Sequence, residues 1–242
     1  MKLRIRIFLL LVNERIIPSV IHNYFIKILN YFTLPKLDRR FKRLKLSQQC
    51  LYKLLNDFEF KTVLDVGAGS CEHAELMEKF GKNVTALDLG KSIYYKNKKN
   101  NLNVVRKNFL DYEPKNKFDA LWASHIFEHQ PDCGLFIKKI SEIVKSNGII
   151  AITVPPPTTM ILGGHLNSFN AGYLMYHLVI NGINCNDCSI LRDGYNVSII
   201  VKNISISPKD LAMDNGDIDR LKSYFPKFVR EPFNGNIRKW NW

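Results

Sequence analysis

The stretch Val63-Leu64-Asp65-Val66-Gly67-Ala68-Gly69-Ser70 decides the fold of this 242-residue chain. A short β-branched run from Lys61 to Val66 leads into two glycines, and a helical pattern then continues to Phe80. Glycines at such a turn let the backbone approach a ligand closely and adopt dihedral angles that other residues avoid. The stretch therefore predicts a strand, a ligand-binding turn and a helix, which is the opening unit of a parallel α/β sheet.

The rest of the chain continues the alternation of strands and helices. Further strands are expected at 83–89, 103–105, 118–123 and 149–154, with helices at 91–101, 136–144 and 170–180. Two last strands, 185–191 and 195–201, are joined by Arg192-Asp193-Gly194, and Asp-Gly between strands is a hairpin signal. The prediction is an α/β fold: a doubly wound sheet of about seven strands, mostly parallel, with a C-terminal antiparallel β-hairpin.

Composition and charge narrow the class of protein. Apolar residues make up 46% and charged residues 24%, as in an ordinary globular protein. Five cysteines are few and odd in number, which indicates a reducing compartment, and we expect a cytoplasmic protein. No apolar stretch reaches the roughly 20 residues that a membrane-spanning helix needs, and the N-terminus lacks the features of a signal peptide.

The first sixty residues form a basic helical arm. They hold 12 Lys and Arg against 4 Asp and Glu, out of a net charge of +13 for the chain. Helical patterns cover 20–32 and Phe41 to Phe58, with basic residues between 36 and 45. We expect a helical lid or dimerisation arm with a solvated basic face. Attachment to the inner face of an anionic membrane and binding of a polyanionic substrate are the alternatives.

The glycine turn does not fit a dinucleotide site. Such a site needs a third glycine at position 72, and this chain has Glu72, whose charge disfavours a pyrophosphate. Asp88 ends the next strand, 21 residues after Gly67. A carboxylate there can accept both hydroxyls of a ribose, which indicates a nucleoside-like cofactor.

Four segments in order resemble the successive motifs of the class I S-adenosylmethionine-dependent methyltransferases. They are Leu64 to Gly69, Leu87-Asp88, the run from Phe118 to His129, and Ile143 to Gly148. The resemblance covers about residues 60–202 and implies a Rossmann-like fold for this region. It divides the chain into an arm (1–60), a cofactor-binding domain (61–202) with an acceptor-loop insertion at 155–170, and a C-terminal tail (203–242) near the acceptor site.

The resemblance also implies roles for individual residues in binding S-adenosylmethionine, which becomes S-adenosylhomocysteine after transfer. Asp65 and the loop Gly67, Ala68 and Gly69 would face the amino-acid end, and Asp88 the ribose. Leu89, Asn108 and Phe109 would lie beside the adenine, with Asn108 replacing the acid that many relatives have. Ser124 would border the methyl group.

The reaction would be direct displacement at the activated methyl group, helped by a base near a hydroxyl acceptor. The candidate bases are His125, Glu128, His129 and His165, and a helix starting at His125 would place His125 and His129 on one face. No metal is required by this chemistry. The pair Cys185 and Cys188 is expected to be buried thiols of a strand rather than zinc ligands.

The acceptor is predicted from a weaker resemblance. The loop 163–172, with the segments 233–237 and Asn241-Trp242, resembles methyltransferases of bacterial surface-polysaccharide clusters. This implies O-methylation of a sugar, a sugar-nucleotide or a phosphate- or phosphoramidate-modified sugar in capsule or lipopolysaccharide synthesis, with Trp240 or Trp242 packing on a sugar face. An RNA methyltransferase, a quinone or other small-molecule methyltransferase and a non-catalytic binding protein stay open. The motifs of enzymes that methylate nucleic-acid amines or cytosine are missing, so nucleic acid is not favoured.

Overall fold

The computed structural model describes residues 24, 27–28, 30–98, 102–158, 162–214, 216–228 and 241–242. Most of the helix expected at 20–32 lies outside these residues, as do Trp240 and the segment 233–237; the described end of that helix is 30–33. Within the described part of the chain, no helix is long and apolar enough to cross a membrane.

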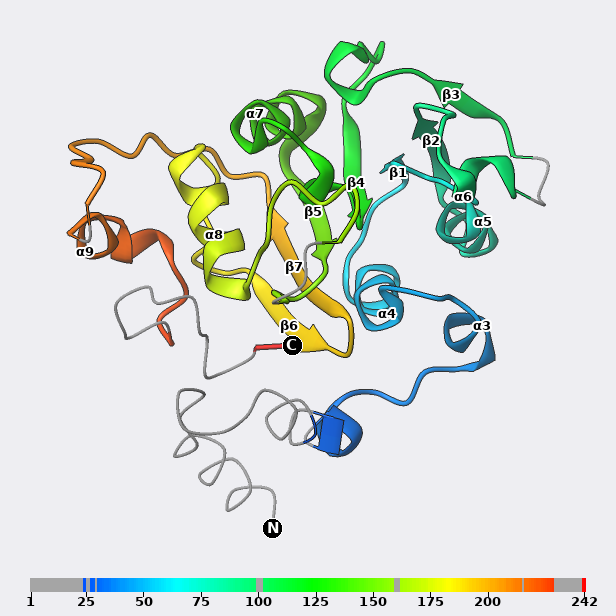
Figure 1. Cartoon of the computed structure of the whole chain (residues 1–242), viewed down its shortest axis with the longest axis horizontal. Helices are drawn as coiled ribbons and strands as arrows, with labels where there is room; N and C mark the ends of the chain where they lie inside the picture. Colours follow the sequence, from blue (N-terminus) through cyan, green and yellow to red (C-terminus); the bar gives the residue numbers. More distant parts are fainter. Residues whose placement is uncertain are drawn as a thin grey trace.

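A seven-stranded sheet forms the centre of the protein (Figure 1). Its order is β3-β2-β1-β4-β5-β7-β6. The strands are β1 Thr62–Val66, β2 Asn83–Asp88, β3 Val104–Arg106, β4 Phe118–Ser124, β5 Val144–Val154, β6 Ser189–Asp193 and β7 Asn196–Lys202. The first five pair in parallel, and β7 pairs antiparallel with both β5 and β6. The predicted fold class is confirmed, including the hairpin, whose turn follows Asp193 and has Gly194 at φ +56°.

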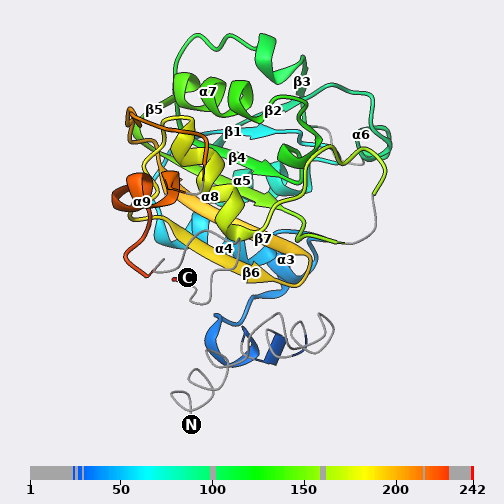
Figure 2. The same cartoon turned by 60° about the vertical axis from the view of Figure 1, so that its left-hand side comes forward.

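Helices cover both faces of the sheet (Figure 2). Those described are α3 Arg39–Lys42, α4 Gln48–Asp57, α5 Glu72–Lys79, α6 Ile93–Lys96, α7 Cys133–Ile143, α8 Ala171–Ile180 and α9 Asp217–Leu221, with short 3-10 turns at Phe109–Asp111 (η1), Phe127–His129 (η2) and Lys222–Tyr224 (η3). One buried cluster joins α7 and α8 to the sheet, and a second joins α3, α4 and α5 to the opposite face. The described arm and the 203–228 segment therefore pack into the same body as the central sheet, because both contribute to these clusters.

The expected helix from Phe41 to Phe58 is broken in the structure. It forms α3 and α4, separated by a turn in which Ser47 has a left-handed φ of +59°. Leu44 is buried within that turn. The apolar pattern therefore continues through the turn, and for this reason it predicts one helix where the structure has two. The basic residues from Lys36 to Lys45 are exposed, as expected of a solvated face.

Two other boundaries differ from the sequence prediction. Helix α7 begins at Cys133 because the Asp132 carboxylate accepts the backbone N–H of Leu135, and it ends at Ile143, where β5 starts at once. The expected stop at Asn147-Gly148 lies inside β5, with Asn147 at φ +60°. Strand β6 starts at Ser189, so Cys185 and Cys188 precede it, both fully buried as free thiols.

Candidate active site

The candidate site lies where the strand order reverses. Strand β1 has β2 on one side and β4 on the other, and ligands of open α/β sheets bind beyond the carboxyl ends of the strands at such a point. Gly67, just after β1, has φ +72°, and a Cβ built on it would lie 2.9 Å from Cγ1 of Ile126, just after β4. The glycine turn and the segment around Ile126 are therefore in direct contact.

The Asp88 carboxylate holds the glycine turn in place. Its Oδ2 accepts the backbone N–H of Gly69 at 2.9 Å, and its Oδ1 accepts that of Gly90 at 2.7 Å. The backbone N–H groups of Gly67 and Ala68 both donate to the carbonyl of Leu87, at 2.8 and 3.1 Å. Strand β2 thus fixes the turn at the place where the sequence predicts the ribose.

Asp65 is a buried acid beneath this turn. It is only 2% exposed, and its Oδ2 has no hydrogen-bond partner among the residues that the structure describes. Burial raises the pKa of Asp65 to about 7, and the negative charge of Asp88 adds to the rise. A cationic group bound above the turn would stabilise the ionised form of Asp65.

The other predicted cofactor residues divide into surface and core positions. Leu89 is 54% exposed beside the turn, whereas Phe109 is 6% exposed and packs on Phe136, with ring centroids 4.6 Å apart. The side-chain oxygen of Asn108 caps η1 by accepting the N–H of Leu110 at 3.2 Å. Ser124 shares a hydrogen bond of 2.7 Å with the hydroxyl of Ser47.

Glu128 is the centre of the predicted base candidates. It is 1% exposed, and its Oε1 lies 3.5 Å from Nδ1 of His125 and 3.8 Å from Nε2 of His129. The expected helix from His125 does not form, because His125 has φ +53° and only the short turn η2 follows. Both histidines nevertheless lie close to Glu128, although His125 precedes it by three residues and His129 directly follows it.

Hydrogen bonds fix the tautomers of these two histidines. Nε2 of His125 contacts the amide oxygen of Asn196 at 3.0 Å, and Nδ1 of His129 contacts the carbonyl oxygen of Gly164 at 2.6 Å. Carbonyl oxygens only accept, so both of these nitrogens carry a proton and donate it. The other nitrogen of each ring is then the one that faces Glu128.

His165 reaches the same place from the loop after β5. Its ring lies edge-on to that of His129, with centroids 4.9 Å apart. The loop is tied down because the N–H groups of Leu166 and Asn167 both donate to the carbonyl of Glu128, at 2.9 and 3.1 Å. The four predicted base candidates therefore gather at one site.

Sequence reasoning missed several residues of the site. Ser47 donates its backbone N–H to Asn196, and the ring of Tyr195 stacks on that of His125, with centroids 5.7 Å apart. The Asp-Gly turn marked the position of Tyr195 and Asn196 but gave no sign that the hairpin tip reaches His125. Trp242, expected near a sugar, packs instead with α4, where Nζ of Lys53 lies 5.4 Å from its ring centroid.

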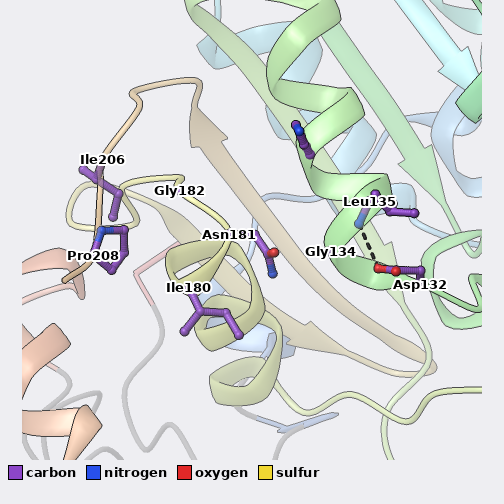
Figure 3. A pocket seen from close by; sticks show the side chains of 9 residues that line it. Asp132, Gly134, Leu135, Ile180, Asn181, Gly182, Ile206 and Pro208 are labelled. Carbon is purple, nitrogen blue, oxygen red and sulfur yellow. Dashed lines mark hydrogen bonds between the residues drawn. The ribbon is translucent and has the colours of Figure 1, made fainter. Parts of the chain in front are cut away.

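A separate groove lies between the start of α7 and the end of α8 (Figure 3). It has a volume of about 480 Å³ and is lined by residues that include Leu135, Ile180 and Pro208. None of the predicted site residues lines this groove, so it does not belong to the candidate site.

Comparison with known proteins shows that this chain is similar to methyltransferases. Residues 64–152 match the family model described as a methyltransferase domain. The chain is 27% identical over 124 residues to a ubiquinone biosynthesis O-methyltransferase of Bradyrhizobium diazoefficiens, covering 48% of this chain and 45% of that protein. It is 33% identical over 96 residues to the protein of that name in Pelagibacter ubique, covering 37% and 40%. The chain thus spans less than half the length of these relatives.

Solved structures show the same fold. A Burkholderia thailandensis 1,6-didemethyltoxoflavin-N1-methyltransferase, with bound 1,6-didemethyltoxoflavin and S-adenosylhomocysteine, has a TM-score of 0.54 at 17% identity over 64% of this chain and 77% of that one. An Archaeoglobus fulgidus S-adenosylmethionine-dependent methyltransferase has a TM-score of 0.52 at 18% identity over 65% and 94%. The matched domain and the shared fold together support S-adenosylmethionine as the cofactor.

Proposed function

We propose that this chain transfers a methyl group from S-adenosylmethionine to a hydroxyl oxygen. The observation that carries the proposal is the contact between Gly67 and Ile126. The glycine turn that would hold the donor touches Ile126, which directly follows His125 and lies two residues before the buried Glu128. A donor bound on the turn would therefore lie next to a cluster of groups that can accept a proton.

The donor site uses groups that already face the turn. The Asp88 carboxylate would accept the ribose hydroxyls, and its present bonds to Gly69 and Gly90 hold both of its oxygens at the binding edge. Asp65 would face the cationic end of the cofactor, since burial leaves its charge unbalanced. Leu89 offers an exposed apolar surface to the adenine.

The transfer is a direct displacement. The acceptor oxygen forms a bond to the methyl carbon as the carbon–sulfur bond breaks and leaves its electron pair on sulfur. The hydroxyl proton must then leave. His129 is the best placed acceptor for it, because its side chain is 37% exposed, against 11% for His125. Its Nδ1 is anchored on Gly164, which leaves the lone pair of Nε2 facing Glu128. The carboxylate would stabilise the resulting imidazolium.

A sugar hydroxyl is the acceptor that we favour, carried by a sugar-nucleotide or a phosphate- or phosphoramidate-modified sugar of capsule or lipopolysaccharide synthesis. The loop at 162–170 carries His165, whose ring lies against that of His129, and the amides of Asn167 and Asn170, and such groups hydrogen-bond to sugar hydroxyls. The exposed basic residues from Lys36 to Lys45 suit an anionic group on such an acceptor.

An aromatic hydroxyl is the second candidate acceptor. Tyr94, Leu166 and Tyr195 are 66%, 63% and 44% exposed, and an apolar ring could cover them. Leu166 and Tyr195 belong to the segments around His129 and His125. The curated relatives are named ubiquinone biosynthesis O-methyltransferases, so this alternative corresponds to the quinone methyltransferase that the sequence leaves open.

Thermal unfolding with S-adenosylhomocysteine tests the donor site. A ligand at 100 times its dissociation constant stabilises a protein by about 2.7 kcal/mol, and Asp88→Ala should lose that stabilisation. Asp57→Ala, which removes an exposed carboxylate outside the site, is the control. No shift in the wild type at millimolar ligand would overturn the proposed cofactor. A shift kept in Asp88→Ala would overturn the role of Asp88. Given a shift, turnover with sugar-nucleotides and with catechol-like phenols decides between the acceptors.

A further inference from the structure

Three side chains beside the donor turn converge on one point. Glu128 and His129 come from η2, and His165 comes from the loop after β5. One ligand atom of each lies within 4.8 Å of the others. The surroundings of each side chain indicate what this cluster binds.

Glu128 is buried without the partners that a carboxylate needs. Neither of its side-chain oxygens has a hydrogen-bond partner in the part of the chain that the structure describes. Its described ion-pair contacts are with His125 and His129, at 3.5 and 3.8 Å. A buried carboxylate is costly unless it is protonated, paired or bound to a metal. Glu128 therefore requires either a proton or a cation.

His129 has the arrangement that a metal-binding histidine usually has. Its Nδ1 donates to the carbonyl of Gly164, which fixes the tautomer and leaves a lone pair on Nε2. That lone pair faces Oε1 of Glu128 at 3.8 Å, so two acceptor atoms point toward each other. A positive charge between them would satisfy both.

His165 is held on the open side of this pair. Its backbone N–H donates to the carbonyl of Leu162 at 3.1 Å, and the next two residues donate to the carbonyl of Glu128. The loop is thereby tied to the residue that carries the carboxylate. The imidazole of His165 is partly exposed, and its ligand atom lies within 4.8 Å of those of Glu128 and His129.

We propose that Glu128, His129 and His165 bind one divalent transition-metal cation, of the kind of Zn²⁺ or Co²⁺. Two imidazoles and a carboxylate are a ligand set that these cations take in proteins, with the remaining positions open to water or substrate. Ligand atoms bound at about 2.0–2.2 Å lie no more than about 4 Å apart, so the 3.8 Å pair already fits. The ligand atoms lie within 4.8 Å of one another, so the widest separation must shrink by about 1 Å on binding, through a movement of the His165 side chain. This proposal replaces the sequence-based expectation that no metal is needed.

The cation site is separate from the proposed donor site. It shares Glu128 and His129 with the proposed proton transfer, so a cation and the hydroxyl proton would compete for Nε2 of His129. Its three ligands are not among the residues assigned to the donor, and cation binding can be measured without cofactor or acceptor. A failure of S-adenosylhomocysteine to bind would leave the cation site intact. A failure of the cation to bind would leave the donor site intact.

Titration of the 242-residue chain with Co²⁺, followed by visible absorption, tests the proposal. We expect one Co²⁺ per chain, with the weak bands of nitrogen and oxygen ligands. Glu128→Gln and His165→Ala should each weaken binding at least tenfold, because second-shell changes alone cost 10–100-fold. His177→Gln removes a histidine of α8 outside the cluster and should bind as the wild type does. The stabilisation by S-adenosylhomocysteine, measured for each variant, reports whether the variant is folded.

Three outcomes would overturn the cation site. One is the absence of binding at millimolar Co²⁺, which would mean that the cluster holds only a proton shared by Glu128 and a histidine. Another is unchanged affinity in His165→Ala, which removes a partly exposed side chain and so leaves no buried cavity. The third is an intense near-ultraviolet thiolate band, which would assign the cobalt to the buried pair Cys185 and Cys188.

Discussion

The side-chain oxygen of Asn196 accepts two hydrogen bonds, one from Nε2 of His125 at 3.0 Å and one from the backbone N–H of Ser47 at 3.1 Å. One atom of strand β7 thus connects the arm to the segment after β4. The hydroxyl of Ser47 also meets that of Ser124 at 2.7 Å. The arm is therefore part of the wall of the candidate active site, and the Asn196 oxygen to which it donates also fixes the tautomer of His125.

Asn196→Ala should lower stability and release the tautomer of His125. The change leaves the buried N–H of Ser47 without its acceptor, which costs about 1–3 kcal/mol in the free energy of unfolding. Denaturant unfolding measures the loss, and ¹⁵N spectra of the histidine rings report the tautomer. Asn97→Ala, at the exposed end of α6, is the control and should change neither. A single Nε2–H tautomer retained in Asn196→Ala would contradict the role of Asn196.

Gly67→Ala should damage the donor site more than the equivalent change at Gly81. Both glycines have positive φ, +72° and +76°, so the backbone strain is similar. A Cβ at Gly67 meets Ile126 at 2.9 Å, whereas a Cβ at Gly81 has nothing within 4 Å. We expect both variants to lose about 1–2 kcal/mol through strain and only Gly67→Ala to lose affinity for S-adenosylhomocysteine, by about tenfold or more. Equal affinity in the two variants, measured by calorimetry, would argue against the contact with Ile126 as a link between donor and acceptor sides.

The sequence predicts the strands because each is a short apolar run bounded by turn residues, and it predicts their mostly parallel direction because helices separate them. It also predicts the Asp-Gly hairpin and the places of Asp65, Gly67 and Asp88, since these follow from strand ends. The break before α4 was missed because Leu44 and Leu51 keep the apolar pattern while Ser47 turns the backbone.

The contacts of the site could not be predicted in the same way. The contact between His125 and Asn196 joins positions 71 residues apart, and no local pattern encodes it. Phe109 shows the same limit: the motif predicts a place near the adenine, and only the structure shows that the ring also packs against Phe136 and is buried. Periodicity describes which side of an element is buried, and tertiary contact decides what each side chain touches.

Cofactor binding should be linked to a proton on Asp65. Burial raises its pKa to about 7 in the unliganded protein, and a cationic cofactor favours the ionised form. The affinity for S-adenosylmethionine should therefore rise between pH 6 and 8, and binding below pH 7 should release a proton. Calorimetry at pH 6.5 in two buffers of different ionisation enthalpy measures the release. Asp65→Asn should show none, and a wild type that releases no proton would exclude Asp65 from the cationic end of the cofactor.

Asp65 and His73 should give the folded protein opposite dependences on pH. His73 is buried, donates from Nε2 to the carbonyl of Leu46 and accepts from Nε1 of Trp122, and burial lowers its pKa to about 4. Between pH 4 and 6.5 the unfolded chain binds the proton of His73 more strongly, so this residue makes stability rise with pH. Asp65 binds its proton more strongly in the folded state, so it makes stability fall over the same interval.

The two slopes offset each other in the wild type and separate in single variants. Each amounts to at most about 1.4 kcal/mol per pH unit. Asp65→Asn should therefore unmask stability that rises from pH 4 to 6.5, and His73→Gln should unmask stability that falls. Urea unfolding at half-unit pH steps gives both slopes, and Asp57→Asn, an exposed acid, should leave the wild-type profile unchanged. Parallel profiles in wild type and Asp65→Asn would show that Asp65 is ionised in the folded protein throughout this range, because a group with the same charge in both states contributes no slope.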